Sequence, residues 1–385
     1  MELNQDFFVP EYMQDFECIG KDCIDSCCIG WNVEIDKKTF KKYENSQNKK
    51  IKLISQQFLV KKDTNSDISY GKLADHNNCC PFLSEEKLCN AYSLLGKENL
   101  SIGCSTYPRV IKKFDKIGFI AGDLSCPEIA RLCLNKSNLK IKKVKQNKLL
   151  NIFNSKNVFS LEISKKIPDK ISDFIEKVFY QINFRNTLFE ALEQIIISYE
   201  KIFKNREYKS FSKDQNEKIK DNSLLFETKI LANICFSNLT SQSRYTTICK
   251  ISANKSKYFQ VSESEFVEKF INTYRTRFSE FKEKNEFIFK NFFINEFIKN
   301  IEGLISSKDF FDDLIREVIL FLSLTNFLLV CQLFEENKKL TINSYVEILS
   351  AVIKKIQSSH QKKNIKSFLK KLDNNNLFKR LVDLY

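Results

Sequence analysis

The sequence predicts a mainly α-helical protein: an irregular, cysteine-rich N-terminal domain with short β pieces around a metal or iron–sulfur centre, followed by a helical C-terminal domain. Two observations predict this fold class. All glycines except Gly303 and all prolines except Pro168 lie in the first third of the chain, and turn-rich backbone needs these residues whereas long helices exclude them. From about residue 161 onward, apolar residues instead recur at the helical period.

The chain divides into three segments on this basis. We expect a cysteine-rich, cluster-binding domain over residues 1–135, a Lys- and Asn-rich linker over 136–158, and a helical domain over 159–385. A length of 385 residues exceeds one ordinary core. An apolar fraction of 43% excludes general disorder.

Cysteines are the main chemical feature of the N-terminal segment. The stretch CIGKDCIDSCC holds four thiols within eleven residues, and four more follow before Pro-Phe-Leu, after Lys-Leu, before Ser-Thr-Tyr-Pro-Arg and before Pro-Glu. Thiolates at this density suit a soft metal or an iron–sulfur cluster, although cysteine also packs as a small apolar residue. The candidate ligands are Cys18, Cys23, Cys27, Cys28, Cys80, Cys89, Cys104 and Cys126.

Eight candidates exceed one site, because a [4Fe-4S] cluster or a structural zinc ion each needs about four thiolates. One cluster with four supporting cysteines, two metal sites, or a cluster with a redox-active pair all agree with the sequence. We expect Cys27 and Cys28 to face different sites because they are adjacent in irregular chain. The remaining cysteines are expected to be structural: Cys79, Cys133, Cys235, Cys249 and Cys331. The two histidines, His76 and His360, are expected at the surface, although His76 is close enough in sequence to Cys79 and Cys80 to be a metal ligand.

Two short strands are expected in the N-terminal segment, over residues 31–36 and 116–120, from alternating or β-rich sequence. In the C-terminal segment, apolar residues between Ile171 and Ile182 recur at steps of three and four, as on one helix face. Two capping boxes are expected, Ser262 with Glu265 and Ser344 with Glu347.

Two apolar stretches of the C-terminal segment are expected in the core. The Phe-rich run from Phe287 to Asn300 predicts a core helix. The run from Val318 to Phe334 is short for a membrane span and contains polar residues, so it predicts a buried helix and no membrane insertion.

Charge and motifs exclude several function classes. The net charge is +14, but lysines alternate with acids and no dense basic run marks a nucleic-acid partner. No secretory signal is visible, so we expect a cytoplasmic protein with reduced thiols, which favours metal over disulfides. Neither a Rossmann GxGxxG nor a P-loop occurs. The CxxxCC order also differs from the CxxxCxxC run of radical S-adenosylmethionine enzymes, which disfavours that chemistry.

Four motifs, CIGKDCIDSCCIGWNVEID, CPFLSEEKLC, CSTYPR and LSCPEIAR, together resemble the flagellin lysine N-methylase family (FliB-like), within the wider group of Cys-rich proteins with a CxxCxxCC-type motif. NFFINEFIKN also resembles a helical stretch of that family. The resemblance implies methyl transfer from S-adenosylmethionine to lysine amines of flagellin, and a [4Fe-4S] cluster on the protein. The resemblance also implies that the eight candidate cysteines named above correspond to the family's motif cysteines.

Methyl transfer to nitrogen requires a neutral amine, whereas a free lysine has a pKa of about 10.4, so the site must desolvate the amine or supply a base. Trp31 and Tyr107 could present aromatic faces to cationic groups, though core packing is the simpler role. Arg109 could hold a carboxylate such as that of the methionine moiety, or pair with Asp123 or Glu128. No catalytic residue, methyl-donor site or oligomeric state follows from the sequence.

Two other functions agree with the same residues. One is a non-enzymatic binding module in which zinc or a cluster only holds the fold together. The other is a redox or metal-handling protein, in which four cysteines bind the metal or cluster and the additional cysteines carry out the function.

Overall fold

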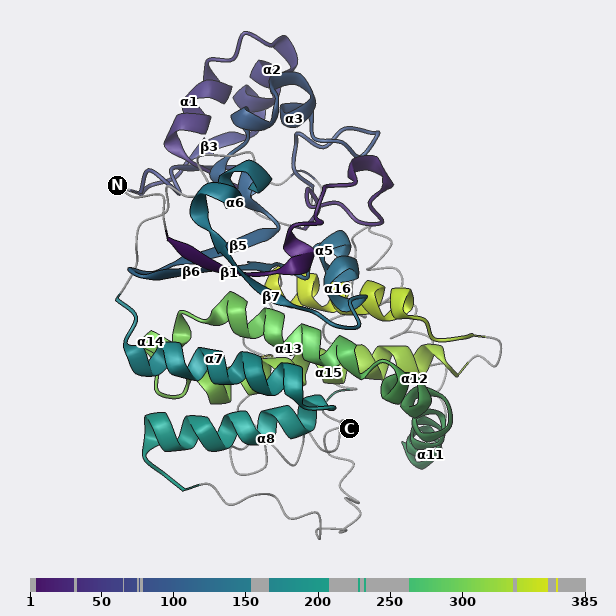
Figure 1. The fold of residues 1–385 in the computed structure, drawn as a ribbon. Coiled ribbons are helices and arrows are strands. Elements are labelled where there is room, and N and C mark those ends of the chain that lie inside the picture. The colour runs from purple at the N-terminus through teal and green to yellow at the C-terminus, as the bar shows by residue number, and fades with distance from the viewer. Residues whose placement is uncertain are drawn as a thin grey trace.

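The computed structural model describes residues 5–153 except 31–32, 65, 75 and 77–78, then 166–207, 263–334 and 338–358, together with the single positions 228, 232 and 365. Figure 1 shows three regions: a small cysteine-rich unit, a four-stranded sheet, and a set of long helices on the other side of that sheet.

The four-stranded sheet joins segments from both ends of the N-terminal third. It comprises β1 (Asp6–Pro10), β5 (Arg109–Lys113), β6 (Ile117–Gly122) and β7 (Ile141–Lys145), in the order β5-β6-β1-β7. Strand β1 runs parallel to β6 and antiparallel to β7. The expected strand over 116–120 is thereby confirmed as part of β6.

Residues 136–158 are not a plain linker. They contain strand β7, which pairs with β1 along its whole length, and helix α6 (Gln146–Phe153). The sequence of β7, IKKVK, is short and mostly charged, so it gives only a weak strand signal of its own. Its extended conformation is instead decided by its pairing with the N-terminal strand β1.

The cysteine-rich unit has its own small sheet and core. Its sheet has the order β2-β4-β3, with β2 (Glu34–Ile35), β3 (Leu59–Lys61) and β4 (Gly71–Leu73). Its short helices and helical turns are α1 (Lys37–Glu44), α2 (Lys49–Phe58), α3 (Asn90–Leu95), η3 (Lys97–Asn99) and α4 (Ile102–Thr106), with η1 (Glu11–Met13) and η2 (Gly20–Asp22) before them. The strand expected over 31–36 is confirmed only as the two residues of β2 within the described part of that range.

The helical region follows α5 (Pro127–Leu134). Its elements are α7 (Asp169–Phe184), α8 (Leu188–Tyr199), η5 (Glu200–Lys204), α11 (Glu263–Thr273), η7 (Tyr274–Phe278), α12 (Ser279–Lys284), α13 (Glu286–Asn300), α14 (Gly303–Ser306), α15 (Phe310–Gln332) and α16 (Ile342–Ser358). The apolar face expected between Ile171 and Ile182 is buried along α7, which confirms that prediction.

Helices α13 and α15 form the centre of the helical region (Figure 1). Helix α13 packs against β6 and α5 on one side and against α7, α8 and α15 on the other, so the predicted core helix is confirmed. Within the described ranges, α15 is the one helix long and apolar enough to cross a membrane, and 89% of its apolar window is buried inside the molecule. Such burial is typical of the core helix of a globular fold.

One hydrophobic core connects the sheet with the helices. It extends from Phe7 and Phe119 in the sheet, through Phe174 and Phe297, to Ile353 in α16. The cysteine-rich unit has a separate core of eight residues: Ile35, Phe40, Tyr43, Ile51, Leu73, Cys80, Phe82 and Ala91.

The predicted capping boxes have different outcomes. Helix α16 begins at Ile342, and the box is formed by Thr341 and Ser344: the Ser344 N–H donates to Thr341 Oγ1 at 3.1 Å, and the Thr341 N–H donates to Ser344 Oγ at 2.9 Å. The predicted start at Ser344 was therefore wrong by one helical turn. Ser262 lies outside the described residues.

Candidate metal centre

The loop between η1 and β2 carries the first four cysteines. Gly20 and Gly30 adopt φ values of +55° and +78°, in the left-handed region that favours glycine. The Cys80 N–H donates to the carbonyl of Cys28 at 2.7 Å, which ties this loop to the next cysteine segment.

Helix starts position the later cysteines. Cys89 directly precedes α3 and Cys126 directly precedes α5, each at the N-cap position. Neither sulfur makes a side-chain cap hydrogen bond, but backbone groups in the first turn of each helix act to lower the pKa of the corresponding thiol. Such groups stabilise a thiolate. Cys104 lies in α4, where its N–H is capped by Ser101 Oγ at 3.2 Å.

One group of thiols centres on Cys28. Its sulfur lies within hydrogen-bonding reach of the sulfurs of Cys27, Cys80 and Cys89. Hydrogen bonding to Cys28 lowers the pKa of each of these three thiols, that of Cys89 to about 6, and raises the pKa of Cys28 itself. Cys104 lies within electrostatic reach of Cys80, Cys89 and Cys27. Cys27 and Cys28 interact with each other in this group, which disagrees with the expectation that they face different sites.

A second group adjoins the first. Cys23 interacts electrostatically with Cys18 and Cys27, and Cys126 with Cys23 and Cys27. Burial raises the pKa of Cys23, and it raises that of Cys126 to about 12. Cys27 therefore connects the two groups, and all eight candidate thiols form one network. None of the eight is in a disulfide.

The donor set has the chemistry of a soft-metal site, since cysteine thiolates bind zinc and iron–sulfur clusters. In the described ranges, however, no three His, Cys, Asp or Glu side chains form a group that could hold a single metal ion. A zinc ion requires about four donors around one point. In a cluster each thiolate binds its own iron atom, so the sulfurs need to gather without sharing one centre. The donor type therefore suits either a zinc ion or an iron–sulfur cluster.

Aromatic and charged side chains border the second group. The Arg109 guanidinium lies over the ring of Phe16, 4.9 Å from its centroid, and Cys18 and Cys126 are its electrostatic neighbours. The expected partners are engaged elsewhere: Glu128 pairs with Arg131 at 2.6 Å and Asp123 lies 3.9 Å from Lys299.

Tyr107 lies beside Cys126 and bonds through its hydroxyl to Ser125 Oγ at 3.1 Å. It is half-buried and packs against the main core, which agrees with a packing role. Trp31 lies outside the described residues.

Helix α16 contacts the cysteine loop through a buried ion pair. The Lys354 ammonium bonds to Asp25 Oδ2 and donates to the carbonyl of Ser26 at 2.8 Å. The side chains are 12% and 3% exposed. Lys354 is also an electrostatic neighbour of Cys27, so a residue near the C-terminal end of the described chain fixes the loop that carries the first thiols.

The remaining cysteines and histidines lie mostly as expected. Cys133 and Cys331 are buried in the main core, and Cys79 is half-buried beside His76 in a short bridge. His76 is exposed and its ring packs edge-on against Phe58, with centroids 5.1 Å apart. The other three candidates, Cys235, Cys249 and His360, lie outside the described residues.

A buried polar stripe on α13 was missed by sequence reasoning. Asn291, Asn295 and Lys299 follow one another at steps of four and face the sheet and α5. Asn291 donates to the carbonyls of Cys133 and Lys136 at 2.9 and 2.7 Å. The i, i+4, i+8 spacing of polar residues in an apolar helix was the available signal.

Asn295 binds both backbone groups of Gly122, donating to its carbonyl at 2.9 Å and accepting from its N–H at 3.2 Å. The Tyr12 hydroxyl also bonds to Asn295 Oδ1. This stripe fixes the end of β6, and the chain continues from there through Asp123 to Cys126. It therefore positions the loop of the second thiol group.

Comparison with known proteins identifies the family of this chain. Residues 170–381 match the model of the FliB lysine N-methylase C-terminal domain. The chain is 35% identical over 127 residues to the flagellar biosynthetic protein FliU of Salmonella muenchen, an alignment that covers 33% of this chain and 75% of FliU. It is equally similar to the lysine-N-methylases of Salmonella choleraesuis and Salmonella typhimurium, but the alignment covers only 32% of each.

No solved structure is significantly similar to the chain. The match to the family model nevertheless covers more than half of the sequence. The matched residues include nearly all of the helical region from α7 to α16. The chain belongs to the FliB lysine N-methylase family.

Proposed function

We propose that this protein is a cytoplasmic, S-adenosylmethionine-dependent protein-lysine N-methyltransferase that acts on flagellin and carries a [4Fe-4S] cluster. Membership of the FliB family supports lysine methylation, and the printed names of its relatives, lysine-N-methylase and flagellar biosynthetic protein, support a flagellar substrate. The observation that carries the proposal is the single network of eight thiols that belongs to a chain of this family.

We assign the cluster first to Cys28 and the three thiols within hydrogen-bonding reach of it, Cys27, Cys80 and Cys89. When bound, a cluster would cross-link the cysteine-rich loops and supply iron beside them. The adjoining thiols, Cys18, Cys23, Cys104 and Cys126, would support it or hold a second centre. Arg109, next to Cys18 and Cys126, is our candidate for binding a carboxylate such as that of the methyl donor.

The reaction places two demands on the protein's own residues. They must align the acceptor nitrogen with the sulfonium methyl group, because orientation alone supplies much of the acceleration in such transfers. They must also remove a proton from the lysine ammonium, whose usual pKa of about 10.4 keeps it charged at neutral pH. Exclusion of water from the site helps both.

The proposal is tested by combining anaerobically purified protein with labelled S-adenosylmethionine and the cognate flagellin. We expect methyl additions on flagellin lysines by mass spectrometry, and brown protein containing iron and sulfide. Colourless protein containing zinc would favour a zinc-stapled fold, and intact cofactor without methyl transfer would remove the enzymatic function.

A cysteine variant tests the ligand assignment. Cys28→Ser should lose most of the iron and much of the soluble yield, since its thiol bridges three others. The matched control is Cys331→Ala in the core of α15, which should keep its iron. Equal iron content in the two variants would remove Cys28 from the ligand set.

A further inference from the structure

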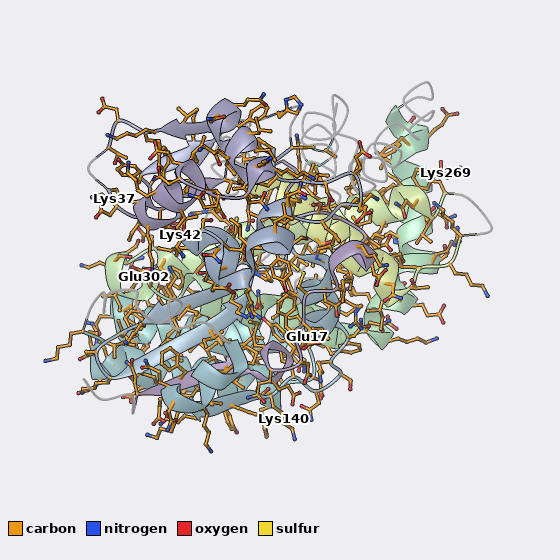
Figure 2. All side chains as sticks on the ribbon, turned by 90° about the horizontal axis from the view of Figure 1, so that it is seen from above. Glu17, Lys37, Lys42, Lys140, Lys269 and Glu302 are labelled. Carbon is orange, nitrogen blue, oxygen red and sulfur yellow. The ribbon has the colours of Figure 1, made fainter. Side chains whose placement is uncertain are left out.

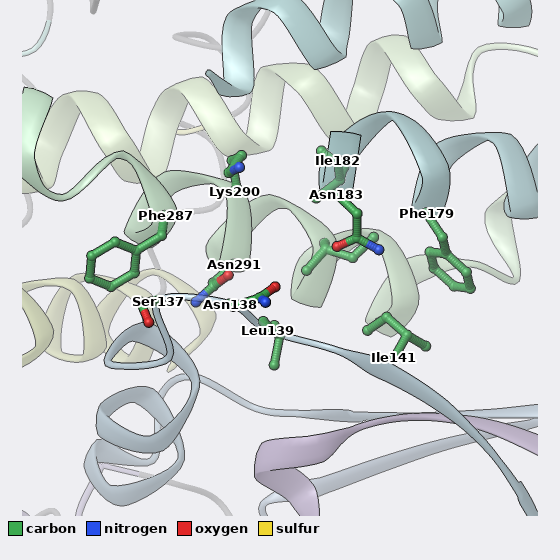
Figure 3. A pocket seen from close by; sticks show the side chains of 11 residues that line it. Ser137, Asn138, Leu139, Ile141, Phe179, Ile182, Asn183, Phe287, Lys290 and Asn291 are labelled. Carbon is green, nitrogen blue, oxygen red and sulfur yellow. The ribbon is translucent and has the colours of Figure 1, made fainter. Parts of the chain in front are cut away.

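A charged pocket lies between strand β5 and the helices α13, α14 and α15. Its volume is about 360 Å³, and its lining includes Lys112, Lys299, Glu302, Phe310, Asp313 and Glu317. Ligand pockets are typically about 300–1,000 Å³. By contrast, the cavity between β7, α7 and α13 that includes Asn183 and Lys290 (Figure 3) measures about 30 Å³. That is about the volume of one water molecule in the liquid, so a side chain would not fit there.

Ion pairs at the surface border the pocket. Lys112 on β5 pairs with Glu302 at 2.8 Å, and their side chains are 31% and 36% exposed. Arg316 pairs with Asp313 at 2.6 Å, with Asp313 66% exposed. Figure 2 shows Glu302 near the edge of the molecule. Exposed pairs of this kind are worth little energetically, so a protein segment can displace or share them.

Lys299 in the pocket lining belongs to a buried charged group, called the floor here, that extends behind the lining and has an excess of negative charge. The Lys299 ammonium lies 3.3 Å from Glu296 Oε2 and 3.9 Å from Asp123 Oδ1, in side chains 13%, 0% and 17% exposed. Glu317 adds a third carboxylate within electrostatic reach of Lys299. One cation therefore faces three carboxylates.

Burial opposes charge on these groups. It raises the pKa of Glu296 to about 7 and also raises the pKa of Glu317, which Lys299 partly offsets. An unbalanced buried charge is costly. A second cation that enters the pocket would balance the site, and a carboxylate with a raised pKa is also a better base for an ammonium proton.

The individual carboxylates differ in how they are engaged. Glu302 and Asp313 pair with Lys112 and Arg316 at the surface, and Glu296 is enclosed by Lys299 and Asn295. Glu317 lines the pocket, and within the described ranges it makes no direct ion pair. It is the carboxylate that an incoming cation would meet.

We propose that this pocket receives the acceptor lysine of the protein substrate, with Glu317 as the carboxylate that binds its ammonium group and accepts its proton. The inference rests on the proposed methyltransferase function. Phe310 supplies an aromatic wall that suits a cationic or methylated ammonium. Asp123 connects the floor to the thiol network, since its carbonyl accepts from the Cys126 N–H at 3.0 Å.

Proton transfer precedes methyl transfer in the proposed reaction. The lysine ammonium transfers one proton to the Glu317 carboxylate, which leaves a neutral nitrogen. Its lone pair forms the new N–CH₃ bond while the CH₃–S bond of the sulfonium breaks, and sulfur keeps the electron pair as a neutral thioether. The positive charge passes from sulfonium to methylammonium, and water takes the proton from Glu317.

Binding tests the pocket without methyl transfer. The probe is Nα-acetyl-lysine N-methylamide, with the norleucine analogue as its uncharged counterpart, measured by calorimetry on the full-length protein. We expect the lysine probe alone to bind, and Glu317→Gln to weaken its binding at least tenfold. The control Glu280→Gln makes the same exchange on the exposed helix α12 and should bind normally. Unchanged binding in Glu317→Gln, or equal binding of norleucine, would overturn the proposal.

A second variant covers the case in which Glu317→Gln does not fold. Ser306→Trp places a large side chain at an exposed position of the pocket lining without changing its charge, and it should also block the probe. S-adenosylhomocysteine should not displace the probe; if it does, the pocket belongs to the methyl donor and the assignment to the acceptor fails.

Catalysis provides a readout that a structural role would not affect. With flagellin, Glu317→Gln should lower kcat at pH 7 while its iron content stays normal. The loss should shrink as pH rises toward the lysine pKa of about 10.4, because more of the acceptor is then already neutral. A pH profile parallel to that of the unchanged protein would contradict the role of Glu317. Absence of methyl transfer in both proteins would count against the proposed function and leave the binding result standing.

Discussion

At the scale of single residues, the informative positions are polar side chains placed where the sequence pattern is apolar. Asn295 and Glu296 are fully buried in α13, and together they bind Gly122, Tyr12 and Lys299. Buried polar groups persist when they are hydrogen-bonded. Here they fix the end of β6 and the floor of the charged pocket.

Glu296 predicts a pH dependence of stability. Burial raises its pKa to about 7 in the folded state, above its value of 4.5 in model compounds. The folded state therefore binds more protons between these values, so stability is greatest below about pH 4.5 and falls as pH rises to about 7. The contribution lost should reach roughly 3 kcal/mol. Urea unfolding at pH 5 and pH 8 measures it.

The variant Glu296→Gln isolates this contribution, because glutamine cannot ionise. Its unfolding free energy should depend less steeply on pH than that of the unchanged protein, and the two curves should converge toward acid. Parallel curves would show that Glu296 is ionised throughout, held by Lys299.

At the scale of elements, α16 and the cysteine loop are joined although they are more than 300 residues apart in the sequence. Helix α16 packs on α5 and α15, and Lys354 extends from it to the buried Asp25. Sequence periodicity predicted the helix but not this contact, because an i, i+3, i+4 pattern identifies the apolar face and not the partner of a polar residue at its edge.

Lys354→Met should destabilise the protein and lower its iron content. The change leaves Asp25 buried without its cation, and removing one partner of a buried pair costs about 3–5 kcal/mol. The matched control is Lys284→Met, which breaks an exposed pair with Glu280 and should cost less than about 1 kcal/mol. Denaturant unfolding and iron analysis compare the two, and equal effects would show that the Asp25 pair has no special role.

At the scale of the whole molecule, a large core and a small one meet at the thiol network. The large core unites the sheet with the helices, whereas the core of the cysteine-rich unit contains only eight residues, Cys80 among them. Small cores supply little net stability and often depend on metals.

The surface lysines do not gather on one face of the molecule. In Figure 2, Lys37, Lys140 and Lys269 lie at separate edges, as expected for lysines that alternate with acids along the chain.

Removal of the proposed cluster should therefore loosen the cysteine-rich unit selectively. We expect hydrogen exchange to increase strongly between residues 18 and 107 after anaerobic chelation, while amides of α13 and α15 stay protected by the large core. Mass spectrometry of peptic fragments resolves the two regions. Uniform loss of protection would show that the two cores unfold as one unit.

Spacing and periodicity alone predicted the grouping of eight cysteines, the change from turn-rich to helical chain, the buried face of α7 and the core position of α13, because each depends on residues near one another in sequence. Tertiary structure decided that Cys27 and Cys28 share one group, that β7 completes the sheet, that Asn295 holds Gly122 and that Glu317 borders a pocket. The β1–β7 pairing and the Asn295–Gly122 contact join residues more than 130 positions apart, and the grouping of Cys27 with Cys28 depends on how a short loop folds. Their free energy comes from packing and burial, which no local pattern specifies.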